Sequence, residues 1–319
     1  MRLPFAALLA VTMAGTQAPA QKQENGRRIP EAEMKSLTAL KAKEGYFVRF
    51  VDGMWTFSTI SPNRRFIAGI QIPPDTPEKD LARMPDISVP FGVDLSGVKL
   101  TSEGARTLAK QKHLQAIHQN TGRIRAPELR ELAAAEQLQV LILPFAAVND
   151  EDVKSIAGLK KLKMLSLFGS RTLTDDHVKG LLALRDLEAL SIYSDKVTAG
   201  GIVALKDLAK LRHIEVNNAM LTDDGLAAIV EAKLLHKLHP IASRDMDRSR
   251  PDGPEGISQL TLIGGSLTGK GLRPIRIAKN LEILDIRGVP VAADDLRLLR
   301  DFPRLSGCFL TARRSTMPA

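Results

Sequence analysis

Apolar residues recur along most of the chain as a triplet at the first, fourth and sixth positions of a repeating unit. Leu138, Leu141 and Leu143 form one such triplet, and the pattern returns 24 residues later at Leu162 and Leu165. Complete or partial units begin at residues 90, 114, 138, 162, 187, 211, 257, 281 and 305. Alternating apolar positions are typical of a strand with one buried face. The pattern therefore predicts a short strand at the start of each unit.

The second half of each unit changes to a helical spacing. A turn rich in Thr, Asp and Gly follows the strand, as in Thr222-Asp223-Asp224-Gly225. Apolar residues three positions apart then fall on one face of a helix, as at Leu226 and Ile229. Threonine and aspartate before such a run are good helix N-caps. Each unit is thus predicted to be a strand, a turn and a helix of about ten residues.

The repeat also carries a resemblance to a known family. The form L-x-x-L-x-L, followed by V/L-T-D-x-G-L-x-x-L, resembles leucine-rich repeats and is similar to the ribonuclease-inhibitor-like branch found in exported bacterial repeat proteins. The resemblance covers residues 90–311. It implies an α/β solenoid of horseshoe shape, with a parallel inner sheet and outer helices, that binds proteins or other macromolecules on its concave face without catalysis. The asparagine that the family places after the strand is replaced here by Phe145, Gly169, Ser194 and Gly264.

A stack of repeats needs protection at its ends, because one unit cannot bury its own apolar face. Residues 21–89 are predicted to form an N-terminal cap, in which Ile67, Ile70 and Ile72 keep the repeat spacing of a diverged first unit. We expect Trp55 and Phe57 to seal this end of the stack. Residues 242–256 carry two prolines and no apolar periodicity, which predicts a surface loop. This loop is either functional or a decayed repeat.

The first residues of the chain have the pattern of a secretory signal peptide. Residues 1–20 combine Arg2, a mostly apolar run and the small-residue site Ala18-Pro19-Ala20. We therefore expect export to the periplasm or the cell exterior. The apolar run is too short to span a bilayer as a stable helix, so no stable membrane insertion is expected after cleavage. Residues 312–319 are expected to form a C-terminal tail.

The candidate binding residues lie on the predicted concave face. Because alternate side chains of a strand point to opposite faces, the residues between the core leucines should face solvent there. Phe168 and Tyr193 occupy equivalent positions on neighbouring strands, and aromatic side chains are frequent interface anchors. The alternative is that they only pack on their neighbours. The predicted site comprises His118, Asn120, Ile142, Met164, Ser166, Phe168, Ser191, Tyr193, His213, Glu215, Asn217, Lys237 and His239.

No catalytic or metal site emerges from the sequence. His213, Glu215 and His239 share the predicted face, but they lack metal-ligand spacing, so no metal is predicted. Residues 264–270 match a phosphate-binding G-x-x-x-x-G-K, yet Gly271 replaces the final Ser or Thr and the segment fits the repeat. The sequence contains no G-x-S-x-G nucleophile motif. We expect neither a cofactor nor enzyme activity.

Composition narrows the choice of partner. Aromatic residues make up 4% of the chain, which argues against a surface that stacks on bases, so no nucleic-acid partner is expected. The single cysteine, Cys308, excludes an internal disulfide. We therefore expect a non-catalytic recognition module for a protein or other macromolecule. The net charge of +9 supports one alternative, a structural envelope-associated protein that binds an anionic polymer through its basic surface.

Overall fold

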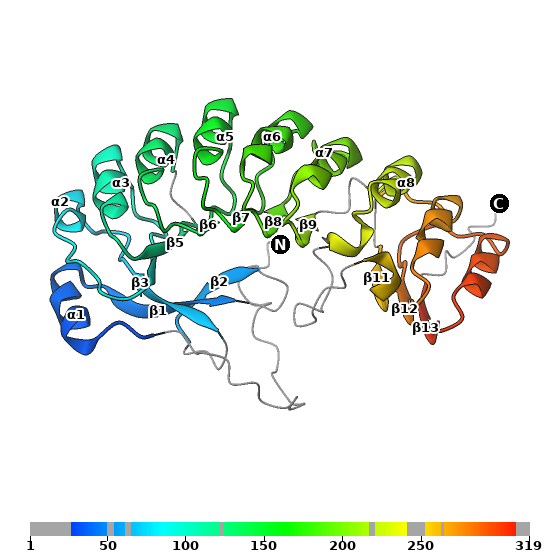
Figure 1. The fold of residues 1–319 in the computed structure, drawn as a ribbon, viewed down its shortest axis with the longest axis horizontal. Helices are drawn as coiled ribbons and strands as arrows, with labels where there is room; N and C mark the ends of the chain where they lie inside the picture. Colours follow the sequence, from blue (N-terminus) through cyan, green and yellow to red (C-terminus); the bar gives the residue numbers. More distant parts are fainter. Residues whose placement is uncertain are drawn as a thin grey trace, which may run out of the picture.

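A computed structural model describes residues 27–49, 54–60, 65–120, 124–216, 221–240, 253–262 and 265–310. These residues form a curved solenoid with strands on the inner, concave side and helices on the outer, convex side (Figure 1). This arrangement confirms the predicted α/β leucine-rich repeat solenoid. The predicted signal peptide, the tail at 312–319 and residues 242–252 of the predicted loop lie outside the described residues.

Two sheets line the inner side of the arch. A ten-stranded sheet has the order β10-β9-β8-β7-β6-β5-β4-β3-β1-β2, and a three-stranded sheet has the order β11-β12-β13. All neighbouring pairs from β3 to β10 and from β11 to β13 are parallel. The strands are β1 (Lys43–Arg49), β2 (Trp55–Ser58), β3 (Phe66–Gln71), β4 (Phe91–Asp94), β5 (Leu114–His118), β6 (Val140–Ile142), β7 (Met164–Leu167), β8 (Ala189–Ile192), β9 (His213–Val216), β10 (Leu238–Pro240), β11 (Gln259–Thr261), β12 (Ile283–Asp285) and β13 (Gly307–Phe309).

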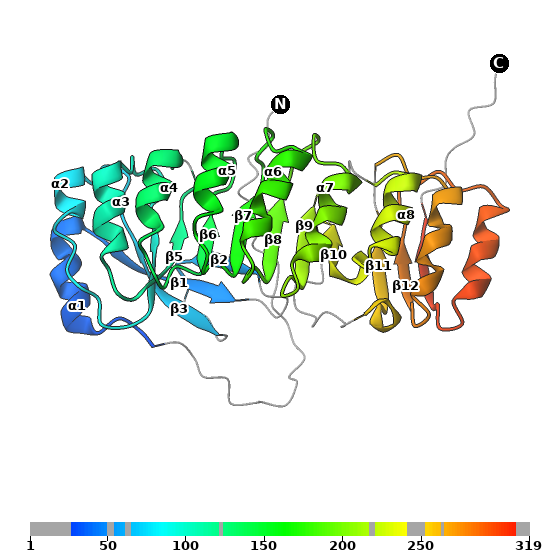
Figure 2. The same ribbon diagram turned by 45° about the horizontal axis from the view of Figure 1, so that its top comes forward.

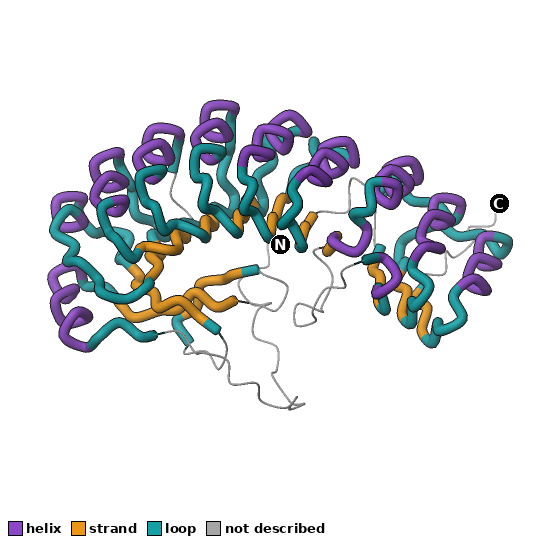
Figure 3. The backbone as a smooth tube through the Cα atoms, viewed as in Figure 1, coloured by secondary structure: helices purple, strands orange, loops and turns teal. Residues whose placement is uncertain are grey.

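Short helices cover the outer side (Figure 3). They are shorter than the ten residues expected, and in the last repeats they take the tighter 3₁₀ form. The α-helices are α1 (Glu31–Ser36), α2 (Glu78–Leu81), α3 (Ser102–Ala109), α4 (Ala126–Leu132), α5 (Asp150–Ile156), α6 (Asp175–Gly180), α7 (Ala199–Ala204) and α8 (Asp223–Glu231). The 3₁₀ helices are η2 (Leu37–Leu40), η3 (Leu181–Ala183), η4 (Leu205–Asp207), η6 (Leu235–Lys237), η7 (Pro254–Gly256), η8 (Lys270–Ile277) and η9 (Asp295–Asp301).

The repeat register explains the core. Equivalent residues of successive units lie opposite one another, so Leu141 pairs with Leu165 and Leu165 with Leu190. Each of these leucines is fully buried. They belong to one continuous cluster that extends from Ile29 to Phe302. Stacking therefore buries the apolar face that one unit would leave in water.

Side-chain caps begin five of the eight α-helices that the structure describes, as the Thr and Asp pattern predicts. The side chains of Thr101, Thr174, Thr198 and Thr222 each accept a hydrogen bond from a backbone N–H in the first helical turn. Asn149 plays the same part at α5. These caps satisfy donors that a helix start otherwise leaves unpaired.

The solenoid begins before residue 90. Strand β3 pairs in parallel with β4, with Ile70 opposite Val93, in the same manner as the later repeat strands. Strands β1 and β2 then extend the sheet in antiparallel fashion as a hairpin. In Figures 1 and 2 this hairpin leaves the arch and crosses its concave side.

Candidate functional site

The hairpin of β1 and β2 covers part of the concave face. Its Phe47, Met54, Trp55 and Phe57 contribute to a second apolar cluster, separate from the main core. The concave members of this cluster are Ala116, Val140, Ile142, Met164 and Ala189, on β5 to β8. The expectation that Trp55 and Phe57 seal the end of the stack is therefore wrong. They instead cover the inner side of the sheet.

Glycines make room for the rings of the hairpin. A Cβ atom at Gly92 would collide with the ring of Phe47, and one at Gly45 would collide with the ring of Phe57. Phe47 is fully buried. Burying such a side chain contributes about 2 kcal/mol. The hairpin is therefore packed closely on the sheet and contributes to the stability of the fold.

Polar and aromatic contacts also hold the hairpin in place. Arg49 at the end of β1 reaches across to Glu188 before β8, with 3.1 Å between Nη2 and Oε2. The ring of Phe57 stacks on that of His118, with 6.1 Å between centroids and 17° between planes. These contacts join segments that lie far apart in the sequence.

The cover changes the status of the predicted concave residues. The expectation of solvent exposure is wrong for Ile142, Met164, Ser166, Ser191 and His213, which are all less than 9% exposed. His118, Glu215 and Lys237 are half-buried, and Lys237 lies in η6 rather than on a strand. Asn217 and the side chain of His239 lie outside the described residues. Strand alternation is correct, but it does not show what packs on the concave face. Hairpin residues from outside the repeats cover Ile142 and Met164, and Ser191 donates a hydrogen bond to Glu215 of the next repeat.

A buried carboxylate organises the polar end of β3 to β5. Asp94 is 2% exposed, and its Oδ1 lies 3.0 Å from His118 Nδ1. Ser96 Oγ donates to the same oxygen at 2.6 Å, and Gln71 Nε2 donates to Oδ2 at 3.0 Å. Burial raises the pKa of Asp94, but hydrogen bonds from His118 and Ser96 outweigh it and hold the pKa below its usual value.

This cluster does not have the geometry of a catalytic triad. Ser96 Oγ and Asp94 Oδ1 both lie near Nδ1 of His118, at 3.5 and 3.0 Å. In a triad the serine and the carboxylate contact opposite ring nitrogens, so that one nitrogen accepts the serine proton while the carboxylate orients the ring through the other. The cluster therefore serves to satisfy a buried charge.

No candidate metal site is found in the part of the chain that the structure describes, and the described part of the G-x-x-x-x-G-K segment makes contacts between repeats. Among the described residues, no group of three His, Cys, Asp or Glu side chains could hold a metal ion. Gly271, which follows the G-x-x-x-x-G-K segment, lies so close to Asp223 that a Cβ atom at this position would collide with that carboxylate. Asp223 in turn accepts hydrogen bonds from Thr268 N at 2.7 Å and Oγ1 at 2.6 Å. The segment therefore joins two repeats.

Three aromatic side chains form a row beyond the ends of β6, β7 and β8, which we call the aromatic edge. Phe168 lies between the other two, with its ring centroid 5.8 Å from that of Phe145 and 5.5 Å from that of Tyr193. Phe145 is 65% exposed, and Phe168 and Tyr193 are half-buried. The sequence identified Phe168 and Tyr193 but missed Phe145.

Phe145 has an unusual backbone for so large a residue. Its φ of 60° lies in the left-handed region, which residues other than Gly, Asn and Asp rarely adopt. Gly169, with φ of 75°, lies under the ring, and a Cβ atom there would collide with it. The signal in the sequence was the replacement of the family's asparagine, which tolerates this backbone, by a phenylalanine.

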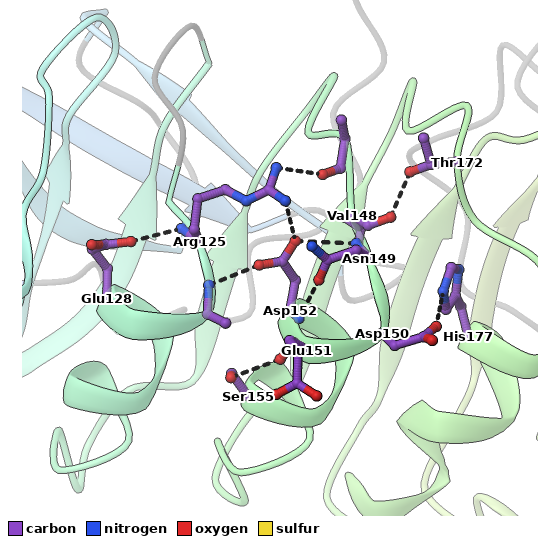
Figure 4. A network of polar contacts seen from close by, with 12 residues as sticks. Arg125, Glu128, Val148, Asn149, Asp150, Glu151, Asp152, Ser155, Thr172 and His177 are labelled. Atoms are coloured by element: carbon purple, nitrogen blue, oxygen red, sulfur yellow. Dashed lines mark hydrogen bonds and ion pairs between the residues drawn. The ribbon is translucent and has the colours of Figure 1, made fainter.

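Polar contacts from both neighbouring repeats hold the loop that carries Phe145 (Figure 4). On one side Arg125 Nη1 donates to the carbonyl oxygen of Ala147 at 2.8 Å, and on the other Thr172 Oγ1 donates to that of Val148 at 2.7 Å. The buried Asp152 binds Arg125 through Oδ2 at 3.1 Å and accepts from Ala126 N through Oδ1 at 2.7 Å. The exposed ring is therefore presented by an ordered loop.

A pocket of about 490 Å³ opens beside Phe145. Ile124, Leu143 and Val148 form apolar walls, while Asn120 and Arg125 add polar groups. Asn120 is an exposed member of the predicted site. The structure thus brings Asn120 to the pocket beside Phe145, whose ring contacts Phe168 in the aromatic edge.

Comparison with known proteins gives only loose likenesses. No family model matches the chain, and no curated protein matches its sequence. Among solved structures, internalin C2 of Listeria monocytogenes is 20% identical with a TM-score of 0.43, covering 73% of this chain and 84% of that one. An internalin, InlF, of the same organism is 15% identical with a TM-score of 0.44, and the match covers 74% of this chain and 89% of the InlF chain. TLR13 in complex with ssRNA13 is also 15% identical at 0.44, covering 72% of this chain and 37% of that one. At these scores the solenoid assignment rests on the chain's own strand register.

Proposed function

We propose that this chain is a non-catalytic recognition module, which binds a macromolecular partner at the aromatic edge and its adjacent pocket. The observation that carries the proposal is the exposed ring of Phe145, held on a left-handed backbone by both neighbouring repeats. Such strain persists only where the surroundings impose it, and it concentrates at functional sites. A large apolar side chain presented to water by an ordered loop is suited to anchoring a partner.

The covered concave face favours this edge over the site proposed from the sequence. Ile142 and Met164 already pack against the chain's own hairpin, so they are not available to a partner. Phe168 and Tyr193 remain partly accessible, and Asn120 lies in the pocket beside Phe145. An apolar side chain of a protein partner would fit between the pocket walls while its polar groups meet Asn120. Export, inferred from residues 1–20, would place this recognition outside the cytoplasm.

The test is capture of partners by the chain from the envelope and secreted fractions of the source cells. We expect a protein retained at high salt by the wild type and lost with Phe145→Ala or with the double variant Phe168→Ala and Tyr193→Ala. Phe309→Ala is the matched control, because Phe309 is also exposed, at 53%, but lies on the last strand, β13, away from the aromatic edge. Equal loss with Phe309→Ala, or unchanged capture with the edge variants, would contradict the proposal.

A further inference from the structure

The two flat sides of the solenoid carry opposite charge. Helices and strands run side by side through the thickness of the arch, so their ends form two flat sides (Figure 2). One of these sides, which we call the basic side, consists of the segments that lead from helices into β5 to β10. These segments are residues 110–113, 133–139, 157–163, 181–188, 205–212 and 232–237.

The basic side carries eleven lysines and arginines against four aspartates and glutamates. On the opposite side, the first turns of α3, α4, α5, α6 and α8 together hold nine acidic residues. Acidic residues stabilise helix N-termini, and this accounts for the acidic side. The same helix dipole favours cations in the last turn of a helix, but Lys160, Lys161 and Lys163 lie four or more positions past the end of α5, in the loop before β7.

Much of this positive charge has no counter-ion in the fold. Lys160, Lys161 and Lys163 are exposed, and they form no ion pair among the described residues. Asp186 binds Lys210 at 2.6 Å, and its pKa is lowered first by that hydrogen bond and then by the charges of Lys210, Lys161 and Lys163. One carboxylate thus lies in the field of three lysines.

Lys237 and Arg212, also on the basic side, form a second region with an excess of positive charge. Burial lowers the pKa of the half-buried Lys237, and the neighbouring charge of Arg212 lowers it further. Cations that repel one another in this way attract anions from solution. An extended anionic surface would supply counter-charge to all of these segments at once.

The geometry of the basic side favours a planar partner. Its charges come from successive repeats whose strands lie about 4.8 Å apart, and all of them lie on one flat side. The exposed large apolar residues among those described, Ile60, Phe145, Phe309 and Leu310, lie outside its six segments. Contact through this side would therefore be electrostatic, without insertion of apolar side chains. Among the described residues, no helix is long and apolar enough to cross a membrane.

We propose that the basic side docks on an anionic lipid surface, whose headgroup phosphates neutralise its lysines and arginines. The aromatic edge follows the strand ends on the opposite side, so it would face away from the lipid and stay open to a partner. This proposal is independent of the partner-binding role of Phe145.

Sedimentation with lipid vesicles tests it on the full chain. The probes are vesicles of phosphatidylcholine containing 30 mol% phosphatidylglycerol, and neutral phosphatidylcholine vesicles control for the apolar N-terminal segment. We expect binding to the anionic vesicles in about 50 mM salt and its loss in about 500 mM salt, where screening is strong. Replacing Lys160, Lys161 and Lys163 by Gln should weaken this binding tenfold or more, because each lysine near an anionic surface contributes substantially to the affinity.

A matched triple variant separates position from net charge. Lys99, Lys196 and Lys270 are also exposed and form no ion pair among the described residues, but they lie outside the basic side, so replacing them by Gln removes the same charge elsewhere. We expect this control to bind the anionic vesicles nearly as the wild type does. Equal weakening in both triple variants would overturn the proposal, as would equal binding to neutral vesicles. Binding to a linear polyphosphate but not to the anionic vesicles would also overturn it. Phe145→Ala should leave vesicle binding unchanged.

Discussion

At the scale of single residues, the account depends on side chains whose position is unfavourable in isolation. Phe145 holds a left-handed backbone, and Asp94 is a charge with 2% exposure. Each is stabilised by its neighbours, Phe145 by contacts from two adjoining repeats and Asp94 by His118, Ser96 and Gln71. Substitutions at Asp94 therefore test the stability of the fold, whereas substitutions at Phe145 test whether the ring is kept for binding.

Replacing Phe145 by Asn tests whether the ring is kept for binding. The left-handed backbone costs most residues about 1 kcal/mol or more, whereas Asn adopts it readily. We expect Phe145→Asn to unfold at the same denaturant concentration as the wild type or a higher one, and to lose partner capture. A variant that captures the partner normally, or that is strongly destabilised, would contradict a binding role for the ring.

The lowered pKa of Asp94 predicts how the stability of the fold depends on pH. Its pKa is lower in the folded protein than in the unfolded chain, so its contribution is fully present above the unfolded value of about 3.9 and is lost as the pH falls through the folded pKa. We expect Asp94→Asn to lower the free energy of unfolding by about 1–3 kcal/mol at pH 7. The deficit should shrink toward pH 3, as measured by denaturant titration. A deficit that is constant with pH would show that the charge is not what stabilises the cluster.

At the scale of elements, the repeat strands follow directly from sequence, whereas the cover on the concave face does not. The triplet places Leu141, Leu165 and Leu190 in the core, and all three are buried in register. The same alternation placed Met164 in solvent, because the pattern of one strand does not show what packs on its other face. That partner, the hairpin, comes from residues 43–58, more than one hundred positions before Met164. Phe145 was missed because it lies one repeat position past the alternating row that contains Phe168 and Tyr193, where alternation no longer tells which way a side chain points.

A larger side chain at Gly92 should release the hairpin without unfolding the repeats. A Cβ atom there collides with Phe47, which is the most buried ring of the hairpin. We expect Gly92→Val to make the chain between β1 and β3 susceptible to limited proteolysis, while circular dichroism shows the repeats folded. Gly307→Ala is the control, since a Cβ atom there would meet only ordinary contacts, the nearest at 3.8 Å. Unchanged protection of the hairpin in Gly92→Val would contradict its close fit on the sheet.

At the scale of the whole molecule, the solenoid is continuous on its outer side but has two sheets on its inner side. Strands β10 and β11 belong to different sheets, and residues 241–252 between them lie outside the described chain. The link between the two parts includes a bridge of Thr222 with Ser266 and the bonds of Asp223 to Thr268. Repeat stability depends on contacts between neighbours, so this junction determines how strongly the two parts unfold together.

Removing the carboxylate of Asp223 should weaken that coupling. Two hydrogen bonds to Thr268 would be lost, which corresponds to about 1–3 kcal/mol. We expect Asp223→Ala to speed amide hydrogen exchange in β11 to β13 far more than in β5 to β8. Asp224→Ala is the matched control, because Asp224 is exposed and adjacent. Uniform acceleration along the whole chain would indicate that the solenoid unfolds as one unit.

Site-specific photo-crosslinking tests the central claim most directly. A photoreactive phenylalanine analogue, which keeps the aromatic ring, would replace Phe145 on the aromatic edge. In a second variant it would replace Thr261 on β11, which is half-buried on the concave side and not part of the hairpin cluster. The crosslinks would be formed in the envelope and secreted fractions of the source cells. We expect a defined adduct from position 145 that disappears with the double variant Phe168→Ala and Tyr193→Ala, and no such adduct from position 261. An adduct from position 261 without one from position 145 would return recognition to the concave face and contradict the account.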